Sequence, residues 1–494
     1  MPFRYPYLVL LLLLTFPLRA QVRESVLPDL EPEDRALEYG RRGSPGAWRD
    51  LAEISLWASG ADPDAPAGKG KPSYLAVMEE GVEEMCSAPD FPEDPKARGE
   101  YVLRFIHRKY LRSYSLSQTR MDTLLGTGRY NCVSSAVLYL IFASAGGLKT
   151  GGVATRDHAF ITLQLNNESI DVETTNPYGF DPGNRREFQD EFGKVTGFAY
   201  VPAKNYRDRT GINSLELISL ILSNRITELE TRSRYAEAVP LGLNRMALLS
   251  GPGNTASSEH FPSGITAAMD RIFNYGAFLL KAGRETEALE WAELGEQKYP
   301  APERWREFTN AAVNNLLVKM VKAGRIGEAR DALTLHRSKL SPGDYGRFDA
   351  MLTDNELARM IREIKDIAGA EELLAFLDRG GEDLPIEAGR VREFRVFALL
   401  KKAEYLVKGE GFSAAIGFIE DAITRYGPEP RLENNLKALH SNRAAELHNS
   451  FAAAYNKGNY GEARSIIEKA LEEYPGNRQL LRDAENLPPA ASSL

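Results

Sequence analysis

Residues 126–145 read GTGRYNCVSSAVLYLIFASA and carry the clearest structural signal in the chain. The glycines mark a loop, and the apolar run after them has the length of a buried helix. The pattern therefore predicts that Cys132 lies in the first turn of this helix. Free backbone N–H groups and the helix dipole favour a negative charge there, so we expect a thiol at this position to have more of the nucleophilic thiolate form.

Cys86 is the only other cysteine in the sequence. It leaves two alternatives open for Cys132. Cys132 can be a buried residue that acts as a small apolar side chain, or it can form a disulfide with Cys86 if the protein is exported. Two cysteines do not supply a four-ligand zinc site of the finger or ribbon type, and the sequence predicts no metal site.

Two strands are predicted after the helix. Residues 158–165 and 169–175 show strand-like patterns and are joined by an Asn-Asn turn. Because the connection is even, His158 lies on the same face of the sheet as Asp171 and Glu173. We expect the cysteine helix to pack against this face, which brings an imidazole and a carboxylate towards the thiol.

The residue types in this order match the chemistry of a cysteine enzyme. His158 takes the thiol proton from Cys132 and later gives it to the leaving amine. The acid binds the other ring N–H and fixes the tautomer of the imidazole. Backbone donors near Cys132 stabilise the oxyanion of a tetrahedral intermediate.

Residues 126–180 resemble the core of the transglutaminase-like superfamily, which is related in architecture to papain-type cysteine peptidases. The matching blocks, in chain order, are Tyr130-Asn-Cys132, Gly147-Leu-Lys-Thr-Gly-Gly-Val153, His158-Ala-Phe160 and Val172-Glu-Thr-Thr175. The resemblance implies that Cys132, His158 and Glu173 are catalytic. It also implies peptide or protein amides as substrates, and no metal or organic cofactor.

The third catalytic residue is the point at which the sequence departs most from the family pattern. Glu173 replaces the usual aspartate, Thr174 the usual proline, and Phe160 an aromatic residue that is usually tryptophan. Asp171 is the competing candidate. Glu173 is preferred because Val-Glu-Thr-Thr aligns with the family block, and because a tight hairpin brings it nearer to His158.

The second half of the sequence is rich in helix formers and repeats itself. Small residues recur at matched spacings near the starts and ends of predicted helices. The central alanines lie 41 to 50 residues apart and are Ala238, Ala288, Ala329, Ala370, Ala415 and Ala463. The pattern resembles the tetratricopeptide repeat, a helix–turn–helix unit of about 34 residues, although the copies here are longer. It predicts a solenoid of helical hairpins that either binds a partner or packs against the first domain.

The first 20 residues resemble a signal peptide. A positive start precedes a short apolar run from Leu8 to Leu14, and Ala20 ends a plausible cleavage site. The alternative is an uncleaved anchor, although the run is shorter than the roughly 20 residues of a membrane span. The net charge of −8 gives no reason to expect nucleic acid as a partner.

The predicted fold class is α+β: a transglutaminase-like, papain-like domain followed by an all-α helical-hairpin solenoid. The predicted parts are a signal peptide at 1–20, the first domain at 21–210, the repeats at 215–485 and a disordered tail at 486–494. The expected function is that of an exported cysteine enzyme that hydrolyses or crosslinks peptide or protein amides through a thioester, with a possible protein partner on the repeats and no membrane span after cleavage. The alternative is a non-catalytic scaffold that binds peptides.

Overall fold

The computed structural model describes residues 27–488, except 44, 157, 167, 184–187, 189–191, 195, 197–208, 252–263 and 381–383. The predicted signal peptide, residues 1–20, lies outside the described residues, and so do residues 489–494 of the predicted tail. The chain divides into two compact units, Met1–Trp305 and Arg306–Leu494.

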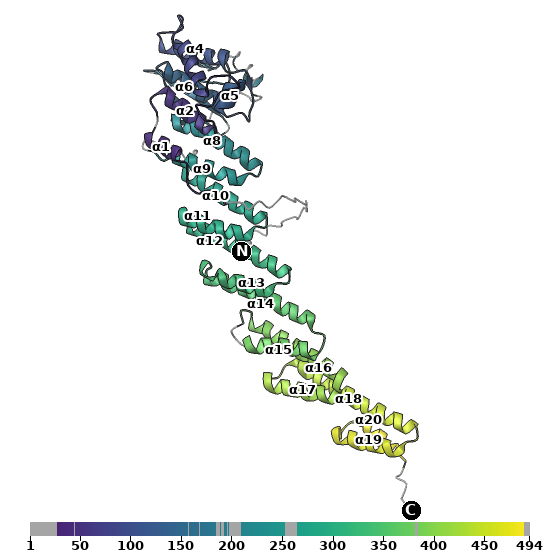
Figure 1. Cartoon of the computed structure of the whole chain (residues 1–494). Coiled ribbons are helices and arrows are strands. Elements are labelled where there is room, and N and C mark those ends of the chain that lie inside the picture. The colour runs from purple at the N-terminus through teal and green to yellow at the C-terminus, as the bar shows by residue number, and fades with distance from the viewer. Residues whose placement is uncertain are drawn as a thin grey trace, which may run out of the picture. The chain divides into compact units, whose positions relative to one another are not determined.

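The predicted α+β fold class is wrong. About 70% of the described residues are in helices, and the sheets are small (Figure 1). In the described part of the chain the strands form one pair and one sheet of four strands. The predicted strands at 158–165 and 169–175 correspond to strands at Ala159–Gln164 and Ser169–Val172, whereas the strand at Lys149–Ala154 was not predicted. They do not set the fold class, because helices precede them, follow them and build most of the core.

In the first unit, helices come both before and after the strands in the sequence. Its described helices are α1 (Asp34–Arg42), α2 (Trp48–Ala58), α3 (Tyr74–Cys86), α4 (Pro95–Lys109), α5 (Met121–Thr127), α6 (Cys132–Ala145), α8 (Ser214–Thr231), α9 (Tyr235–Leu249), α10 (Gly264–Lys281) and α11 (Glu285–Lys298). The core is built around α6, whose residues 132–143 are all buried. Helices α2, α4 and α8 and strands β3 and β4 pack against it. A helix that is apolar on all sides is stable only when it is covered in this way.

The strands of the first unit form two small sheets. They are β1 (Ser113–Tyr114), β2 (Arg129–Tyr130), β3 (Lys149–Ala154), β4 (Ala159–Gln164), β5 (Ser169–Val172) and β6 (Thr210–Ile212). Strands β1 and β2 are parallel, and the other four are antiparallel in the order β5-β4-β3-β6. Thr162 lies opposite Asp171, so the predicted parity of the hairpin is confirmed.

Helices α8 and α9 belong to the first unit because its earlier helices cover them. Helix α8 packs on α2 and α6, and α1 packs on α9. Glu33, just before α1, accepts a hydrogen bond from Asn244 of α9 (2.8 Å), and its own N–H donates to the Asn244 side chain (2.8 Å). The division of the chain at residue 305 therefore lies well beyond the change in composition near residue 210.

The described chain after α11 continues as helices. They are α12 (Pro302–Lys322), α13 (Ile326–Leu335), α14 (Pro342–Glu363), α15 (Ile367–Gly380), α16 (Ala388–Glu410), α17 (Phe412–Tyr426), α18 (Pro430–Asn456), α19 (Tyr460–Glu473) and α20 (Arg478–Glu485), with a single 3-10 turn at Arg337–Lys339. Within the described residues, no helix combines the length and the apolar character that crossing a bilayer requires.

The six alanines that marked the sequence repeat occupy one structural position. Each is the fourth residue of its helix and is buried, as Ala238 is in α9 and Ala463 in α19. The others are Ala288, Ala329, Ala370 and Ala415. A methyl side chain at this point lets two helices approach closely, which explains why the alanines recur while the residues around them vary.

Helix α17 allows a matched test of this explanation. Ala415→Leu places three extra carbons in a site with no exposed surface, and we expect it to lower the free energy of unfolding by about 1–3 kcal/mol. Gly417, two residues later, has open space around its missing side chain. Gly417→Ala should therefore raise the free energy of unfolding by roughly 0.5–1 kcal/mol through helix propensity. Urea unfolding followed by circular dichroism measures the free energy of unfolding of both variants. An Ala415→Leu protein as stable as the native protein would contradict the close-contact role of Ala415.

Candidate active site

Cys132 is the first residue of α6, as the sequence predicted, because Asn131 caps this helix. The Asn131 side chain accepts a hydrogen bond from the Ser134 N–H (3.0 Å), and Ser134 Oγ accepts one from the Asn131 N–H (3.0 Å). The Asn131 amide also donates to the carbonyl of Leu116 (3.1 Å). The helix start is thereby fixed to the segment that follows β1, and the position of the sulfur with it.

The first backbone donors of α6 are available to a ligand. Within the described residues, no hydrogen bond is found from the N–H of Cys132 or of Val133. The capping side chain binds the third N–H, and the fourth donates to the Asn131 carbonyl (3.0 Å). Two donors at a helix start, next to a thiol, form a place where a developing oxyanion is stabilised.

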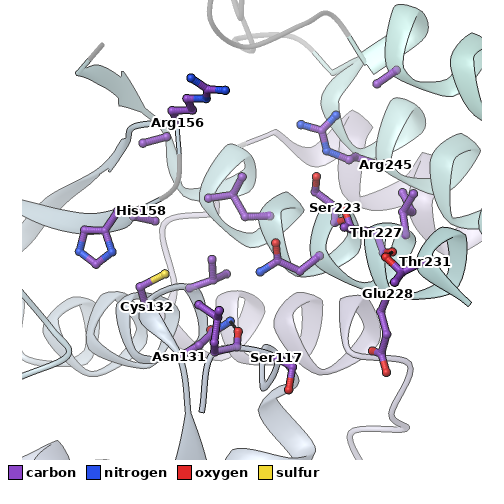
Figure 2. A pocket seen from close by; sticks show the side chains of 18 of the residues that line it. Ser117, Asn131, Cys132, Arg156, His158, Ser223, Thr227, Glu228, Thr231 and Arg245 are labelled. Atoms are coloured by element: carbon purple, nitrogen blue, oxygen red, sulfur yellow. Dashed lines mark hydrogen bonds between the residues drawn. The ribbon is translucent and has the colours of Figure 1, made fainter. Parts of the chain in front are cut away.

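His158 lies in the turn just before β4, one residue outside the strand that was predicted to begin with it. Thr155 holds this turn, because its hydroxyl accepts a hydrogen bond from the His158 N–H (3.2 Å). The ring Nε2 lies 2.6 Å from Oε2 of Glu173. In Figure 2 the Cys132 sulfur lies beside the ring of His158, and the interaction with Cys132 contributes to the raised pKa of the imidazole. Since Nε2 is engaged by Glu173, Nδ1 is the ring nitrogen left for the sulfur.

Glu173 is buried and firmly held. Its Oε1 accepts hydrogen bonds from the Thr175 hydroxyl (2.8 Å) and the Thr175 N–H (3.3 Å), which leaves Oε2 for His158. Gly179 lies so close that a β-carbon there would meet the Glu173 carbonyl oxygen at 2.0 Å. The competing candidate, Asp171, instead pairs with Arg209, whose Nη1 lies 2.7 Å from Oδ2. The structure therefore brings Cys132, His158 and Glu173 together and directs Asp171 elsewhere.

The charge state of His158 follows from its two partners. Burial lowers the pKa of the imidazole, but the Glu173 carboxylate, together with hydrogen bonds to Cys132 and Glu173, outweighs it and raises the pKa well above 6.5. The side chain of His158 is only 12% exposed. The site thus favours a protonated imidazole between a sulfur and a carboxylate, which is the arrangement that a thiolate nucleophile needs.

Aromatic rings enclose the imidazole. Phe160 stacks on His158 with ring centres 6.1 Å apart, and Phe192 meets it edge-on at 5.9 Å. The predicted aromatic at position 160 therefore contacts the ring of the predicted base. This cover limits the access of water to the imidazole and strengthens its interaction with Glu173.

Three residues that sequence reasoning did not assign to the site hold the segment that carries Glu173. His107 Nε2 donates to the Thr174 carbonyl (3.0 Å), Ser135 Oγ bonds Thr174 Oγ1 (2.8 Å), and the Tyr130 hydroxyl donates to the Thr175 carbonyl (3.1 Å). Tyr130 lay within the family-like block, but nothing in the local sequence of His107 marked it, because its contact is 67 residues away.

His107 makes the stability of the protein depend on pH. Burial, opposed by the bond to Thr174, lowers its pKa from 6.5 to about 4. In the unfolded chain it takes up a proton near pH 6.5, whereas in the folded protein it does so only near pH 4. Its contribution is therefore complete above pH 6.5 and is lost as the pH falls towards 4, by on the order of 1–3 kcal/mol.

His107→Gln tests this assignment, because the glutamine amide retains a donor for Thr174 but does not titrate. We expect the free energy of unfolding to fall less steeply between pH 6.5 and pH 4 in the variant than in the native protein. His158 does not produce the same slope, since a raised pKa affects stability only above pH 6.5. Urea unfolding across this range measures the difference, and parallel curves would contradict the buried neutral state of His107.

Cys132 and His158 lie at one end of a cleft with a volume of about 1190 Å³ (Figure 2). One side is formed by α8, through residues that include Asn224 and Thr227. The opposite end is reached by Arg245 of α9. Although Cys132 is only 7% exposed, it therefore borders a space with the volume of a ligand-binding cleft.

Cys86 and Cys132 are both free, so the alternative of a disulfide between them is wrong. Cys86 is exposed at the end of α3, and its sulfur contacts the Ala145 carbonyl at 3.8 Å. Among the described residues, no group of three or more histidine, cysteine, aspartate or glutamate side chains is arranged to hold a metal ion.

Comparisons with known proteins do not assign a family to the chain. No family model and no curated protein matches the chain. Among solved structures, the crystal structure of menin, described as revealing the binding site for the Mixed Lineage Leukemia protein, aligns with 83% of this chain and 96% of its own, at 10% identity and a TM-score of 0.29. A TM-score this low does not indicate a shared fold.

Proposed function

We propose that the protein is a cysteine enzyme that transfers an acyl group from a peptide or protein amide to water or to an amine, through a thioester at Cys132. The contact of His158 Nε2 with Glu173 at 2.6 Å carries the proposal, because the Cys132 sulfur lies beside the same ring (Figure 2). A buried carboxylate, an imidazole and a thiol in series at the edge of a cleft match the requirements of nucleophilic catalysis.

In the first half of the proposed reaction, the Cys132 thiolate attacks the carbonyl carbon of the amide. The oxyanion that forms accepts hydrogen bonds from the N–H groups of Cys132 and Val133. The C–N bond then breaks, and the leaving amine takes the proton from Nδ1 of His158. The products of this half are a free amine and a thioester on Cys132.

In the second half, water or an amine attacks the thioester carbonyl, and His158 takes the proton of the attacking molecule. The C–S bond breaks, and the sulfur returns as a thiolate beside a protonated imidazole. With water the acyl product is a carboxylic acid, and with an amine it is a new amide. Hydrolysis is the default because water is always present. Glu173 stabilises the imidazolium in both halves without itself being protonated.

The remaining parts of the proposal rest on the sequence. The family-like blocks of residues 126–180 support peptide amides as the substrate class, and residues 1–20 support export. The helical repeats, predicted at 215–485, are proposed to bind a substrate or a protein partner, as arrays of helical hairpins commonly do. Mass spectrometry of the secreted mature protein tests export, since cleavage after Ala20 leaves Gln21 as the new N-terminus.

The reaction class is tested by incubating the full-length protein with a library of acyl-donor peptides and measuring its intact mass. We expect an added acyl mass on the native protein, or release of the amine product, and neither on Cys132→Ala. Cys86→Ala serves as the matched control, because it removes the exposed thiol and leaves the site intact.

Thiol labelling separates the enzyme from a peptide-binding scaffold. With Cys86→Ala as the background, an active site predicts that iodoacetamide modifies Cys132 rapidly near neutral pH and slowly after His158→Ala. Equal, slow labelling in both proteins, together with the absence of any acyl adduct, would instead support the scaffold.

A further inference from the structure

The segment between β1 and α5 is bonded to the start of α6 at two points. The Leu116 carbonyl accepts a hydrogen bond from the Asn131 side chain (3.1 Å). Two residues later, the Gln118 carbonyl accepts one from Ser134 Oγ (3.2 Å). Both donors belong to the cap and first turn of the helix that begins with Cys132. The segment therefore has a fixed position relative to the sulfur.

The same segment also holds an amide in the wall of the cleft. Asn224 lies on α8 and lines the cleft. Its Nδ2 donates a hydrogen bond (3.1 Å) to the hydroxyl of Thr119, which is only 2% exposed. Since Thr119 directly follows Gln118, the Asn224 side chain is tied to the start of α6 through this buried hydroxyl. The amide is therefore oriented relative to Cys132 before any ligand binds.

The Asn224 amide keeps hydrogen-bonding capacity for a ligand. A side-chain amide carries two N–H donors and one oxygen acceptor, and Thr119 takes one donor. Within the described residues, no second hydrogen bond of this side chain is found. Its oxygen is not among the buried polar atoms that lack a partner, so it is open to solvent. One N–H and the carbonyl oxygen are thus left beside the cleft.

The threonines that α8 adds to the cleft offer less. The Thr227 hydroxyl donates to the Ser223 carbonyl (3.0 Å), and the Thr231 hydroxyl donates to the Thr227 carbonyl (2.7 Å). Their protons are used within the helix, so a ligand finds only oxygen acceptors there. Asn224 differs from both threonines, because it presents a donor and an acceptor in one rigid plane.

We propose that Asn224 binds the backbone of the substrate, so that the substrate of Cys132 is an extended polypeptide segment and not a small isolated amide. The N–H and C=O of one residue in an extended chain point to the same side, as they do when two strands exchange a pair of hydrogen bonds. The free N–H and oxygen of Asn224 match that pair. The inference rests on the proposed function, because it takes Cys132 to be the reactive residue of the same cleft.

A scan of backbone esters tests the contact in the full-length protein. In the best peptide of the acyl-donor library, each peptide bond except the cleaved one is replaced in turn by an ester, which removes one N–H donor and keeps the side chains. We expect one position at which the ester lowers kcat/KM by about 5- to 100-fold, as an unpaired polar group costs. The masses of the products check that the same bond is cleaved throughout.

Variants assign the sensitive position to Asn224. Asn224→Ala should lower kcat/KM for the all-amide peptide and reduce the effect of the ester at that position to within about threefold. Asn224→Asp removes both donors and should also lower kcat/KM for the all-amide peptide. Asn355→Ala is the matched control, because the Asn355 amide donates to the Met351 carbonyl within α14, and it should leave the ester scan unchanged. Thermal unfolding of each variant checks that it is folded.

A binding measurement separates this inference from the proposed function. The fluorescein-labelled ester series is titrated into Cys132→Ala, with fluorescence anisotropy as the readout. Weaker binding of one ester than of the all-amide peptide, by a factor that Asn224→Ala removes, would support the contact even if the native protein shows no turnover. Turnover with no sensitive ester position, or a sensitive position that persists in Asn224→Ala, would overturn the contact and leave the enzyme proposal standing.

Discussion

His158→Ala is expected to lower kcat/KM by at least about 10³-fold, because it removes the group that takes the proton from Cys132 and returns it to the leaving amine. The loss is expected mainly in kcat, since the ring serves the reaction more than the binding of the substrate. The rate of product release from the best peptide of the acyl-donor library measures the effect in the purified full-length protein.

Two further variants sharpen this test. Adding Cys132→Ala to His158→Ala should reduce the rate no further than the single change does, because the two side chains act as one unit. His440→Ala serves as the matched histidine control, since His440 bonds Tyr474 within the second unit. A His158→Ala protein that is folded and keeps its rate within tenfold would contradict the role of His158 as the base.

Glu173→Gln is the second change with a large expected effect. We expect kcat to fall by roughly 10²–10⁴-fold, because a neutral amide no longer stabilises the imidazolium and can hold the ring in the wrong tautomer. The shape of the side chain is kept, so that the hydrogen bonds with Thr175 have a replacement and the fold is preserved.

The pH profile shows whether Glu173 acts through His158. Burial lowers the pKa of His158, and the Glu173 carboxylate is the main group that raises it. Without that charge the imidazolium loses its proton at a lower pH, so the alkaline limb of the kcat/KM profile should move to lower pH in Glu173→Gln. Asp171→Asn is the control, because Asp171 pairs with Arg209 and should leave the limb in place. An unchanged limb in Glu173→Gln would argue against coupling to His158.

The local parts of the site could be predicted from the sequence because each depends on residues that are near in the chain. The start of α6 lies where the apolar run after the glycines predicted it, directly after Asn131, which caps the helix. The predicted glycine loop is a short helix, α5, which Gly128 ends, followed by β2. The even hairpin connection fixes the register in which Thr162 faces Asp171. Glu173 itself lies just beyond β5, which ends at Val172 and not at residue 175 as predicted. The choice of Glu173 over Asp171 agrees with the contacts of the two residues, although the catalytic role of Glu173 stays a prediction.

The fold class could not be predicted in the same way. The hairpin signal predicted strands, but β4 and β5 are short. The core depends on helices that lie far from the hairpin in the sequence. The burial of His107 against Thr174 and the packing of α8 on α6 involve separations that no local periodicity encodes. For the same reason, the change in composition near residue 210 does not coincide with the limit of the first compact unit at Trp305.

The hydrogen bonds between Glu33 and Asn244 also bear on how the chain is made. They join residues 211 positions apart. Helix α1 therefore cannot contact α9 until the ribosome has added the residues between them. At about 5–20 residues per second this delay is about 10–40 s. During that time α1 lacks its contacts with α9 and keeps only nearby partners such as Trp57, which meets the Tyr39 ring.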